Sequence, residues 1–330
     1  MNRKVSVAPM MDCTDKHERY FLRLISKNVL LYTEMVVSEA IDRGDRHKLL
    51  SFNLEEKPVA LQLGGSSPKL LSSAAKIGEE FGYDEINLNL GCPSKKVQKN
   101  KFGACLIKEP NLVADCLSEM QSKTKLPLTV KTRIGYDQVE DYEHLYNFIN
   151  ILKSTGVKTF IIHARKAMLG KFTPKQNLNI PPLKYEMVYK LKEDFKDLNI
   201  IINGGITSPE QIKDHLKKVD GVMIGRSIYH SPYLLADIEK EIFDNEDIYT
   251  RQEVVEKLVK YLKDEIKKGT RVNQVMRHTL GLFHGQTGSN FWKRYLSENM
   301  CVRDADIQKV DHILDKVKLN HVTQPTGQID

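Results

Sequence analysis

The chain has 330 residues, enough for one large α/β domain and a smaller unit, of which 41% are hydrophobic and 28% charged. This balance excludes the disordered and fibrous classes of protein. Lysine and arginine outnumber aspartate and glutamate by 50 to 43, and the net charge of +7 mildly favours an anionic partner. Five widely spaced cysteines without a C-x-x-C pair argue against a disulfide framework and against a zinc site.

The N-terminal residues 1–9 lead directly into a short apolar run and lack the apolar stretch of a signal peptide. No window approaches the ~18 consecutive apolar residues of a membrane-spanning helix. We therefore expect a reduced, cytoplasmic protein with no membrane association, no metal and no obligate protein partner.

Short β-branched runs alternate with longer segments of helical periodicity, as in a parallel sheet built from βα units. Helices are expected at 67–81 and 208–216, where a Ser-Pro pair or an apolar face marks the helix. Eight alternating strands over about 230 residues predict a TIM barrel. A Rossmann-like sheet is the weaker alternative, because no G-x-G-x-x-G follows the first strand. The predicted strands are residues 5–9, 29–36, 58–64, 85–90, 127–133, 158–163, 199–203 and 221–225.

From about residue 237 the β-branched runs stop and amphipathic helices follow, as in residues 251–268. We therefore expect two domains, a TIM barrel over residues 1–236 and an all-helical domain over residues 237–330.

Polar residues and glycines end the predicted strands, which is where TIM barrels carry their active sites. A purely structural barrel would not need this set. In strand order the set comprises Pro9, Met10 and Met11, then Gln62, Asn89 and Cys92, Lys131 and Arg133, His163 and Arg165, Asn203, Gly204 and Gly205, and lastly Gly225 and Arg226.

The last two strands end in Asn203-Gly-Gly205 and Gly225-Arg226. TIM barrels commonly bind phosphate at this place, because glycine lets backbone N–H groups approach the anion and an arginine adds a charge-assisted bond. A simple turn is the alternative for the first triplet alone. Together the two segments favour a phosphate site.

Lys131, His163 and Gln62 are donors suited to the polar edge of an isoalloxazine ring. Each residue has a structural alternative, since a buried histidine is commonly a core residue and a lysine commonly lies on the surface. Their position at strand ends opposite a phosphate site favours FMN.

Cys92 follows the fourth strand and precedes Pro93, which ends the strand. A free cysteine is commonly a small buried hydrophobe. Asn87 and Asn89 argue otherwise, because polar side chains at alternating positions share one face of a strand. The thiol could be a nucleophile or a proton donor, and the sequence pattern leaves both roles open.

Seven segments together resemble the tRNA-dihydrouridine synthase family, and within it the DusA-type branch. The resemblance covers nearly the whole chain, including Trp292–Glu298, and N-L-G-C-P is its most specific motif. The segments are A-P-M-M-D at 8–12, Y-T-E-M at 32–35, Q-L-G-G at 62–65, D-E-I-N-L-N-L-G-C-P at 84–93, H-A-R-K-A at 163–167, I-P-P-L at 180–183 and G-V-M-I-G-R at 221–226.

The resemblance implies an FMN enzyme that reduces uridine in tRNA to dihydrouridine, at positions 20 and 20a of the D-loop, with NADPH as the reductant. It assigns Cys92 as the proton donor to C5, after hydride transfer to C6, and Asn89 as a residue that holds the uridine. It assigns FMN binding to Pro9, Met10, Met11, Gln62, Lys131, His163, Asn203, Gly204, Gly205, Gly225 and Arg226.

A tRNA substrate also requires a basic surface. Residues 257–297 contain nine basic residues against two acidic ones. Part of this charge could be the solvated face of a helix. The residues expected to contact tRNA are Lys95, Arg165, Lys175, Lys293 and Arg294.

Two other functions remain open from the sequence. An FMN-dependent dehydrogenase of a small molecule would share the phosphate site but would not need a basic helical appendage. A tRNA-binding folding factor would not depend on Cys92.

Overall fold

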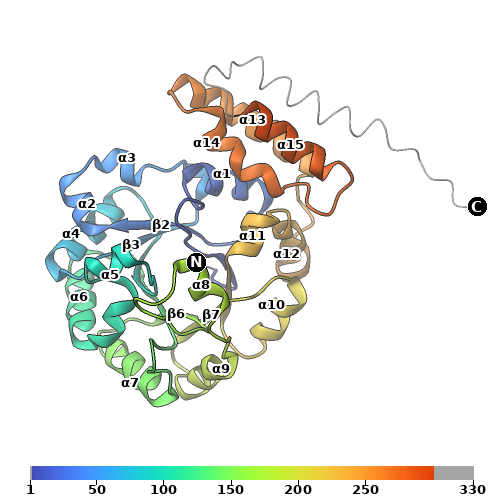
Figure 1. The fold of residues 1–330 in the computed structure, drawn as a ribbon. Coiled ribbons are helices and arrows are strands. Elements are labelled where there is room, and N and C mark those ends of the chain that lie inside the picture. Colours follow the sequence, from blue (N-terminus) through green and yellow to red (C-terminus); the bar gives the residue numbers. More distant parts are fainter. Residues whose placement is uncertain (1, 301–330) are drawn as a thin grey trace, which may run out of the picture. The chain divides into compact units, whose positions relative to one another are not determined.

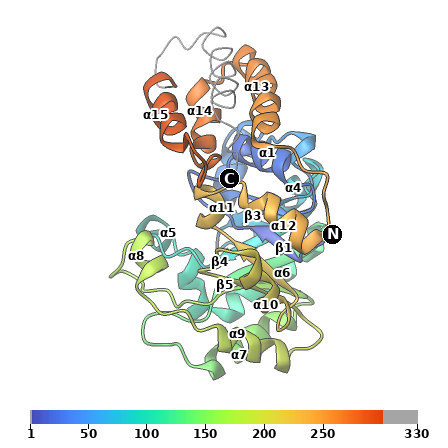
Figure 2. The same cartoon turned by 90° about the vertical axis from the view of Figure 1, so that its right-hand side faces the viewer.

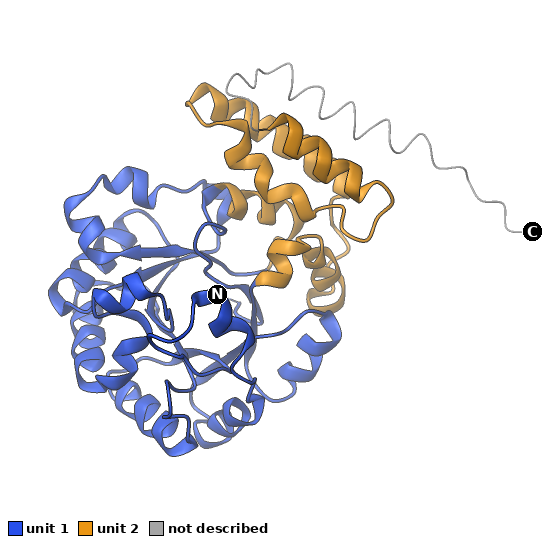
Figure 3. Cartoon of the chain, viewed as in Figure 1, with its two compact units in different colours: residues 1–16, 29–225 blue, residues 17–28, 226–330 orange. Residues whose placement is uncertain are grey.

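The computed structural model describes residues 2–300, so that Cys301 and the rest of the predicted C-terminal domain lie outside the described residues. The chain divides into two compact units (Figure 3). One unit contains residues 1–16 and 29–225, and the other contains residues 17–28 and 226–330. The two compact units separate after residue 225, whereas the sequence predicts a domain boundary after residue 236. The boundary at 236 is meant to separate functional domains, and it remains a prediction.

The first unit is an eight-stranded parallel sheet whose order is β1-β8-β7-β6-β5-β4-β3-β2 (Figure 1). Between β1 and β2 the ring is closed by one isolated parallel bridge, in which the Val7 N–H donates to Leu30 O at 2.9 Å. The prediction of a TIM barrel is therefore confirmed. The strands are β1 (Val5–Val7), β2 (Leu31–Val37), β3 (Val59–Gly64), β4 (Glu85–Leu90), β5 (Leu128–Arg133), β6 (Thr159–His163), β7 (Asn199–Asn203) and β8 (Gly221–Ile224).

The interior of the barrel is filled by side chains from alternate strand positions. A buried apolar cluster contains Tyr32 of β2, Ala60 of β3, Ile161 of β6, Ile201 of β7 and Met223 of β8. On β4 and β5 the inward positions are polar instead, from Glu85 to Asn89 and from Thr129 to Arg133. These polar positions lead toward the carboxyl ends of the strands.

Helices surround the strands, and their first residues show why they start where they do. Ser67 and Ser208 accept hydrogen bonds from the N–H of Leu70 and Gln211, and a proline follows each serine. The predicted helices at 67–81 and 208–216 are thereby confirmed. The helices of this unit are α2 (Ser38–Arg43), α3 (Arg46–Leu50), η1 (Leu54–Glu56), α4 (Pro68–Glu80), α5 (Lys95–Lys99), η2 (Gly103–Lys108), α6 (Pro110–Lys123), α7 (Tyr142–Lys153), α8 (Pro174–Asn179), α9 (Tyr185–Asp194) and α10 (Pro209–Leu216).

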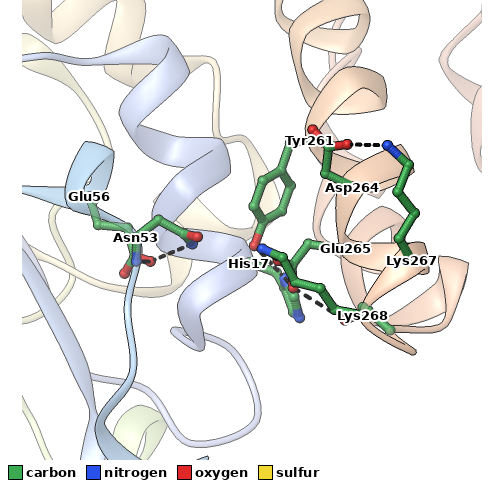
Figure 4. A network of polar contacts seen from close by, with 9 residues as sticks. His17, Asn53, Glu56, Tyr261, Asp264, Glu265, Lys267 and Lys268 are labelled. Carbon is green, nitrogen blue, oxygen red and sulfur yellow. Dashed lines mark hydrogen bonds and ion pairs between the residues drawn. The ribbon is translucent and has the colours of Figure 1, made fainter. Parts of the chain in front are cut away.

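In the second unit, all the regular elements up to residue 300 are helices. It includes nearly all of the first helix of the chain, whose residues lie more than two hundred positions before their partners. Asn28 donates to Glu239 at 2.7 Å, and His17 Nδ1 lies 2.7 Å from Tyr261 Oη (Figure 4). The helices are α1 (Lys16–Ile25), α11 (Arg226–His230), α12 (Leu234–Phe243), α13 (Arg251–Lys267), α14 (Val272–Met276), η3 (Arg277–Gly281) and α15 (Ser289–Asn299).

Cys13, Cys92, Cys105 and Cys116 are free thiols. Within residues 2–300, no three His, Cys, Asp or Glu side chains are grouped so that they could hold a metal ion. None of the helices described is long and apolar enough to cross a membrane.

Candidate active site

Side chains predicted to bind a cofactor meet at the carboxyl end of the barrel. Lys131 of β5 donates through Nζ to Asn203 Oδ1 of β7 at 2.9 Å, and Asn203 donates through Nδ2 to Met223 O at 2.8 Å. His163 of β6 lies beside this pair, because β6 is hydrogen-bonded to both β5 and β7. The structure thus brings together residues that are separated by up to 72 positions in the chain.

Gly204 and Gly205 form a turn that other residues would not fit. Their φ angles are +122° and +73°, in the region that favours glycine. A Cβ at Gly204 would lie 2.7 Å from His163 Cδ2, and one at Gly205 would lie 2.6 Å from Leu183 Cδ1. Two successive glycines therefore pack directly on the side chains that line the end of β7.

The loop after β1 reaches the end of β8. A Cβ at Gly225 would lie 3.5 Å from Met10 Sδ. Met10 is fixed by the hydroxyl of Thr14, which accepts from the Met10 N–H at 3.0 Å, while Met11 is 54% exposed. Pro9 precedes them, and Arg226 begins α11 immediately after Gly225.

The turn that carries Cys92 is hydrogen-bonded at each of its peptide groups. The N–H groups of Gly91 and Cys92 donate to Asn89 Oδ1 at 3.1 and 3.0 Å. The carbonyl of Cys92 accepts from the Ala104 N–H at 3.0 Å, and that of Pro93 accepts from Gln98 Nε2 at 2.7 Å. Cys92 is therefore held at a defined place after β4, and its side chain is partly exposed.

Gly103 allows the start of η2 to pack against this turn. Its φ is +71°, and a Cβ at this position would lie 2.7 Å from Cys92 O and 2.5 Å from Val97 Cγ1. Any larger residue at position 103 would displace the cysteine.

Arg133 at the end of β5 belongs to the polar strand-end set, but the sequence interpretation gave it no role. Its side chain is 3% exposed, and it donates to three backbone carbonyls. Nε donates to Gly91 O at 2.9 Å, and Nη1 donates to Lys166 O at 3.0 Å and to Asn177 O at 3.3 Å. The guanidinium thereby connects the Cys92 turn to α8 and to the loop that precedes it. The available signal was a second basic residue two positions after Lys131, on the same face of the strand.

The basic side chains at this end of the barrel are buried, which disfavours their charged forms. Burial and the nearby charge of Arg133 lower the pKa of Lys131 to about 7, and the charge of Cys92 opposes this shift. Burial lowers the pKa of Arg133 to about 10, and again a charge on Cys92 opposes the change. The two basic side chains thus lie on the same face of β5, and Arg133 also contacts the Cys92 turn through Gly91 O.

The residues expected to contact tRNA are placed differently. Lys95, Lys175, Lys293 and Arg294 are exposed. Arg165 instead donates to the carbonyl of Pro181, so part of its guanidinium is used to hold the loop after β6.

The basic residues of α13 support the alternative that some of this charge is only a solvated face. Lys267 lies 2.7 Å from Asp264, and Lys268 lies 2.8 Å from Glu265 (Figure 4). By contrast, Lys95, Lys96, Lys99 and Lys101 have no acidic partner among residues 2–300.

The comparisons with known proteins identify the family of the chain. The family model described as Dihydrouridine synthase (Dus) matches residues 6–318. A relative from Synechocystis sp., named tRNA-dihydrouridine(20/20a) synthase, is 51% identical over 91% of this chain and 90% of its own length. Proteins of the same name from Shewanella oneidensis and Escherichia coli K12 are 49% and 51% identical, over 98% and 94% of this chain and 97% and 90% of their own lengths. The chain therefore belongs to the dihydrouridine synthase family, whose members are flavin-dependent oxidoreductases.

Proposed function

We propose that this protein reduces uridine to 5,6-dihydrouridine in the D-loop of tRNA, at positions 20 and 20a, with FMN as cofactor and NADPH as its reductant. The names of relatives at about half identity over at least nine-tenths of both chains support the substrate. The observation that carries the reaction is a thiol on a turn that Asn89 and the buried Arg133 hold by hydrogen bonds. We propose the cytoplasm as the compartment, because tRNA is processed there.

The residues at the carboxyl end of the barrel fit FMN. Gly204 and Gly205 follow β7 with φ angles that favour glycine, at the place where TIM barrels commonly bind phosphate through backbone N–H groups. Asn203, Gly225 and Arg226 are assigned to the same phosphate group. Lys131 is bonded to a neutral amide, which leaves its charge free to stabilise an electron-rich ring.

The remaining cofactor contacts are assigned to the residues around this cradle. Gln62 and His163 are assigned to the polar edge of the ring, and Pro9, Met10 and Met11 to its surroundings. When bound, FMN supplies the hydride that is added to C6 of the uracil.

Cys92 completes the reduction by giving the thiol proton to C5, so that the C5=C6 double bond gains one hydride and one proton. The guanidinium of Arg133, which donates to Gly91 O, is assigned to hold the turn in place during this step. Asn89 uses its carbonyl for the Cys92 turn and one N–H for Gln62, and its second N–H is assigned to the uracil.

The substrate base must leave its stack to reach the barrel, at a cost of a few kcal/mol that backbone contacts offset. We assign such contacts to Lys95 on α5, to Arg165 and Lys175 on the segment between β6 and α9, and to Lys293 and Arg294 on α15. Residues 237–330 are proposed to act as a tRNA-binding domain. Figure 2 shows α5 and α8 at the same end of the barrel.

The substitution Cys92→Ala tests the proposed role directly. The variant should retain bound flavin and oxidise NADPH, but dihydrouridine formation should fall by about 10²-fold or more, because a positioned proton donor contributes roughly that factor. Mass spectrometry of tRNA from the variant reaction measures the product. An unchanged yield of dihydrouridine would refute the proton-donor role, and a wild-type protein that forms none would refute the function.

A further inference from the structure

A continuous line of side-chain hydrogen bonds runs through the barrel interior, from the first residue of β4 to the Cys92 turn. Thr129 donates to Glu85 Oε1 at 2.6 Å, and Asn87 Nδ2 donates to Thr129 Oγ1 at 2.9 Å. Gln62 Nε2 then donates to Asn87 Oδ1 at 2.8 Å, and Asn89 Nδ2 donates to Gln62 Oε1 at 2.8 Å. The last acceptor, Asn89 Oδ1, receives the Cys92 N–H at 3.0 Å.

The direction of the line is set at both ends, by the N–H groups of Gly91 and Cys92, which can only donate, and by Glu85. Its carboxylate can only accept, and it is paired with Arg3, which contacts Oε2 through Nε at 2.8 Å and Nη2 at 2.6 Å. Tyr32 also donates to Oε1, at 2.7 Å. The hydroxyl of Thr129 must therefore give its proton to Glu85 and accept from the next residue.

The shape of an amide does not distinguish its oxygen from its nitrogen, so each orientation depends on the neighbouring bond. With Thr129 as an acceptor, Asn87 must turn its nitrogen toward it, and Gln62 and Asn89 follow in the same sense. All the members of the line are at least nine-tenths buried, so water cannot replace a lost partner.

We infer that Thr129, oriented by Glu85, is a positioning residue for Cys92 that acts through the amides of Asn87, Gln62 and Asn89. If the line were reversed, Asn89 would direct its nitrogen toward the N–H groups of Gly91 and Cys92. Two donors would then face each other, and the turn would shift. The inference rests on the proposed function, because it concerns the placement of the proton donor.

The substitution Thr129→Val tests this inference, because valine has the shape of threonine but cannot transmit the orientation. We expect kcat for dihydrouridine formation to fall between about tenfold and a hundredfold, the size of effect that a small misplacement of a reacting group produces. The KM values for tRNA and NADPH should stay unchanged. Thr129→Ser keeps the hydroxyl and should restore kcat.

Thr132→Val is the matched control. Thr132 lies on the same strand and is equally buried, but its side chain is on the opposite face and has only long contacts, at 3.5 Å to Leu90 O and 3.4 Å to Arg133 O. Both valine variants change the core alike, so only the loss of orientation should separate their kcat values. Equal kcat values in the two variants would overturn the inference.

A second readout needs no turnover. In cofactor-free protein, the alkylation of Cys92 by iodoacetamide, followed by peptide mass spectrometry, should be several-fold faster in Thr129→Val, because the turn is less firmly held. The rates of Thr129→Ser and Thr132→Val should match the wild type. If Thr129→Val does not fold, Thr129→Ala takes its place against Thr132→Ala, and equal rates in that pair would overturn the inference.

These results also separate the inference from the function. A wild-type enzyme that forms dihydrouridine and a Cys92→Ala variant that does not would support the function. Identical behaviour of the two valine variants in the same assay would then refute the positioning role alone.

Discussion

The two ends of the barrel interior differ in whether a buried charge has a partner of opposite charge. At the amino end, where the strands begin, the Glu85 carboxylate is matched by Arg3 and by the hydroxyls of Tyr32 and Thr129. At the carboxyl end, Lys131 and Arg133 are bonded, among residues 2–300, to an amide and to backbone carbonyls. The first charge is compensated within the protein, and the second pair is not.

This difference separates a structural use of charge from a functional one. A buried charge without a counter-charge reduces stability, so it is expected where a ligand or a reaction intermediate supplies the missing partner. The amino end stabilises the fold and fixes the orientation of polar side chains, whereas the carboxyl end is suited to hold electron-rich groups.

Removing the positive charge that pairs with Glu85 at the amino end should have the largest effect on stability. Arg3→Met leaves the Glu85 carboxylate buried without a cation, and we expect the free energy of unfolding to fall by about 3 kcal/mol. Urea denaturation measures the change. Arg43→Met, at an exposed position of α2, is the control and should change stability by less than about 0.5 kcal/mol. A loss as small as that of the control would show that the ion pair is dispensable.

Removing the charge of Lys131 at the carboxyl end should instead stabilise the protein relative to the wild type as the pH falls. Lys131 has a pKa of about 7 in the folded, cofactor-free protein and near ~10.4 when unfolded, so the unfolded state binds more protons between these values. Wild-type stability should therefore rise with pH relative to Lys131→Met, by roughly 2 kcal/mol between about pH 7 and about pH 9. If the free energies of unfolding of the two proteins changed equally with pH over this range, the lowered pKa of Lys131 would be contradicted.

The lysines of α5 and of the turn after it extend the comparison to the protein surface. Changing Lys96, Lys99 and Lys101 to glutamine should weaken tRNA binding roughly tenfold or more, and should reduce the slope of log K against log salt by about 2. Filter binding at several salt concentrations measures both quantities. A smaller reduction of this slope is expected for the double variant with Lys293→Gln and Arg294→Gln.

The control removes the same number of charges at the other end of the barrel. Lys123, Lys196 and Lys218 are exposed and precede β5, β7 and β8. Their change to glutamine should leave the salt slope nearly unaltered. Equal slopes in the two triple variants would mean that α5 does not approach the RNA backbone.

Most of the fold could be predicted because local patterns determine it. The predicted strands at 85–90 and 199–203 coincide with β4 and β7, and the other six differ by at most two residues at either end. The β-branched runs and the Ser-Pro pairs that begin α4 and α10 provide a local signal. The membership of α1 in the helical unit had no such signal, because its partners lie far along the chain.

The candidate site was predicted less completely. The strand-end rule identified Cys92, Lys131 and Asn203, of which the structure brings the last two into contact. It included Arg133 without a role and did not include Thr129, because the roles of both depend on carbonyls and amides supplied by other strands. Polar residues at alternate positions of β4 and β5 were the visible sign, but the partners are set by strand register.

The division of the helical unit has a consequence for synthesis on the ribosome. Residues 17–28 emerge early, yet Asn28 and its partner Glu239 are separated by 211 positions. At roughly 5–20 residues per second, the early segment waits about 10 to 40 seconds for that partner. During this interval the apolar face of α1 is exposed, so the nascent chain is expected to need protection there until α12 and α13 have been made.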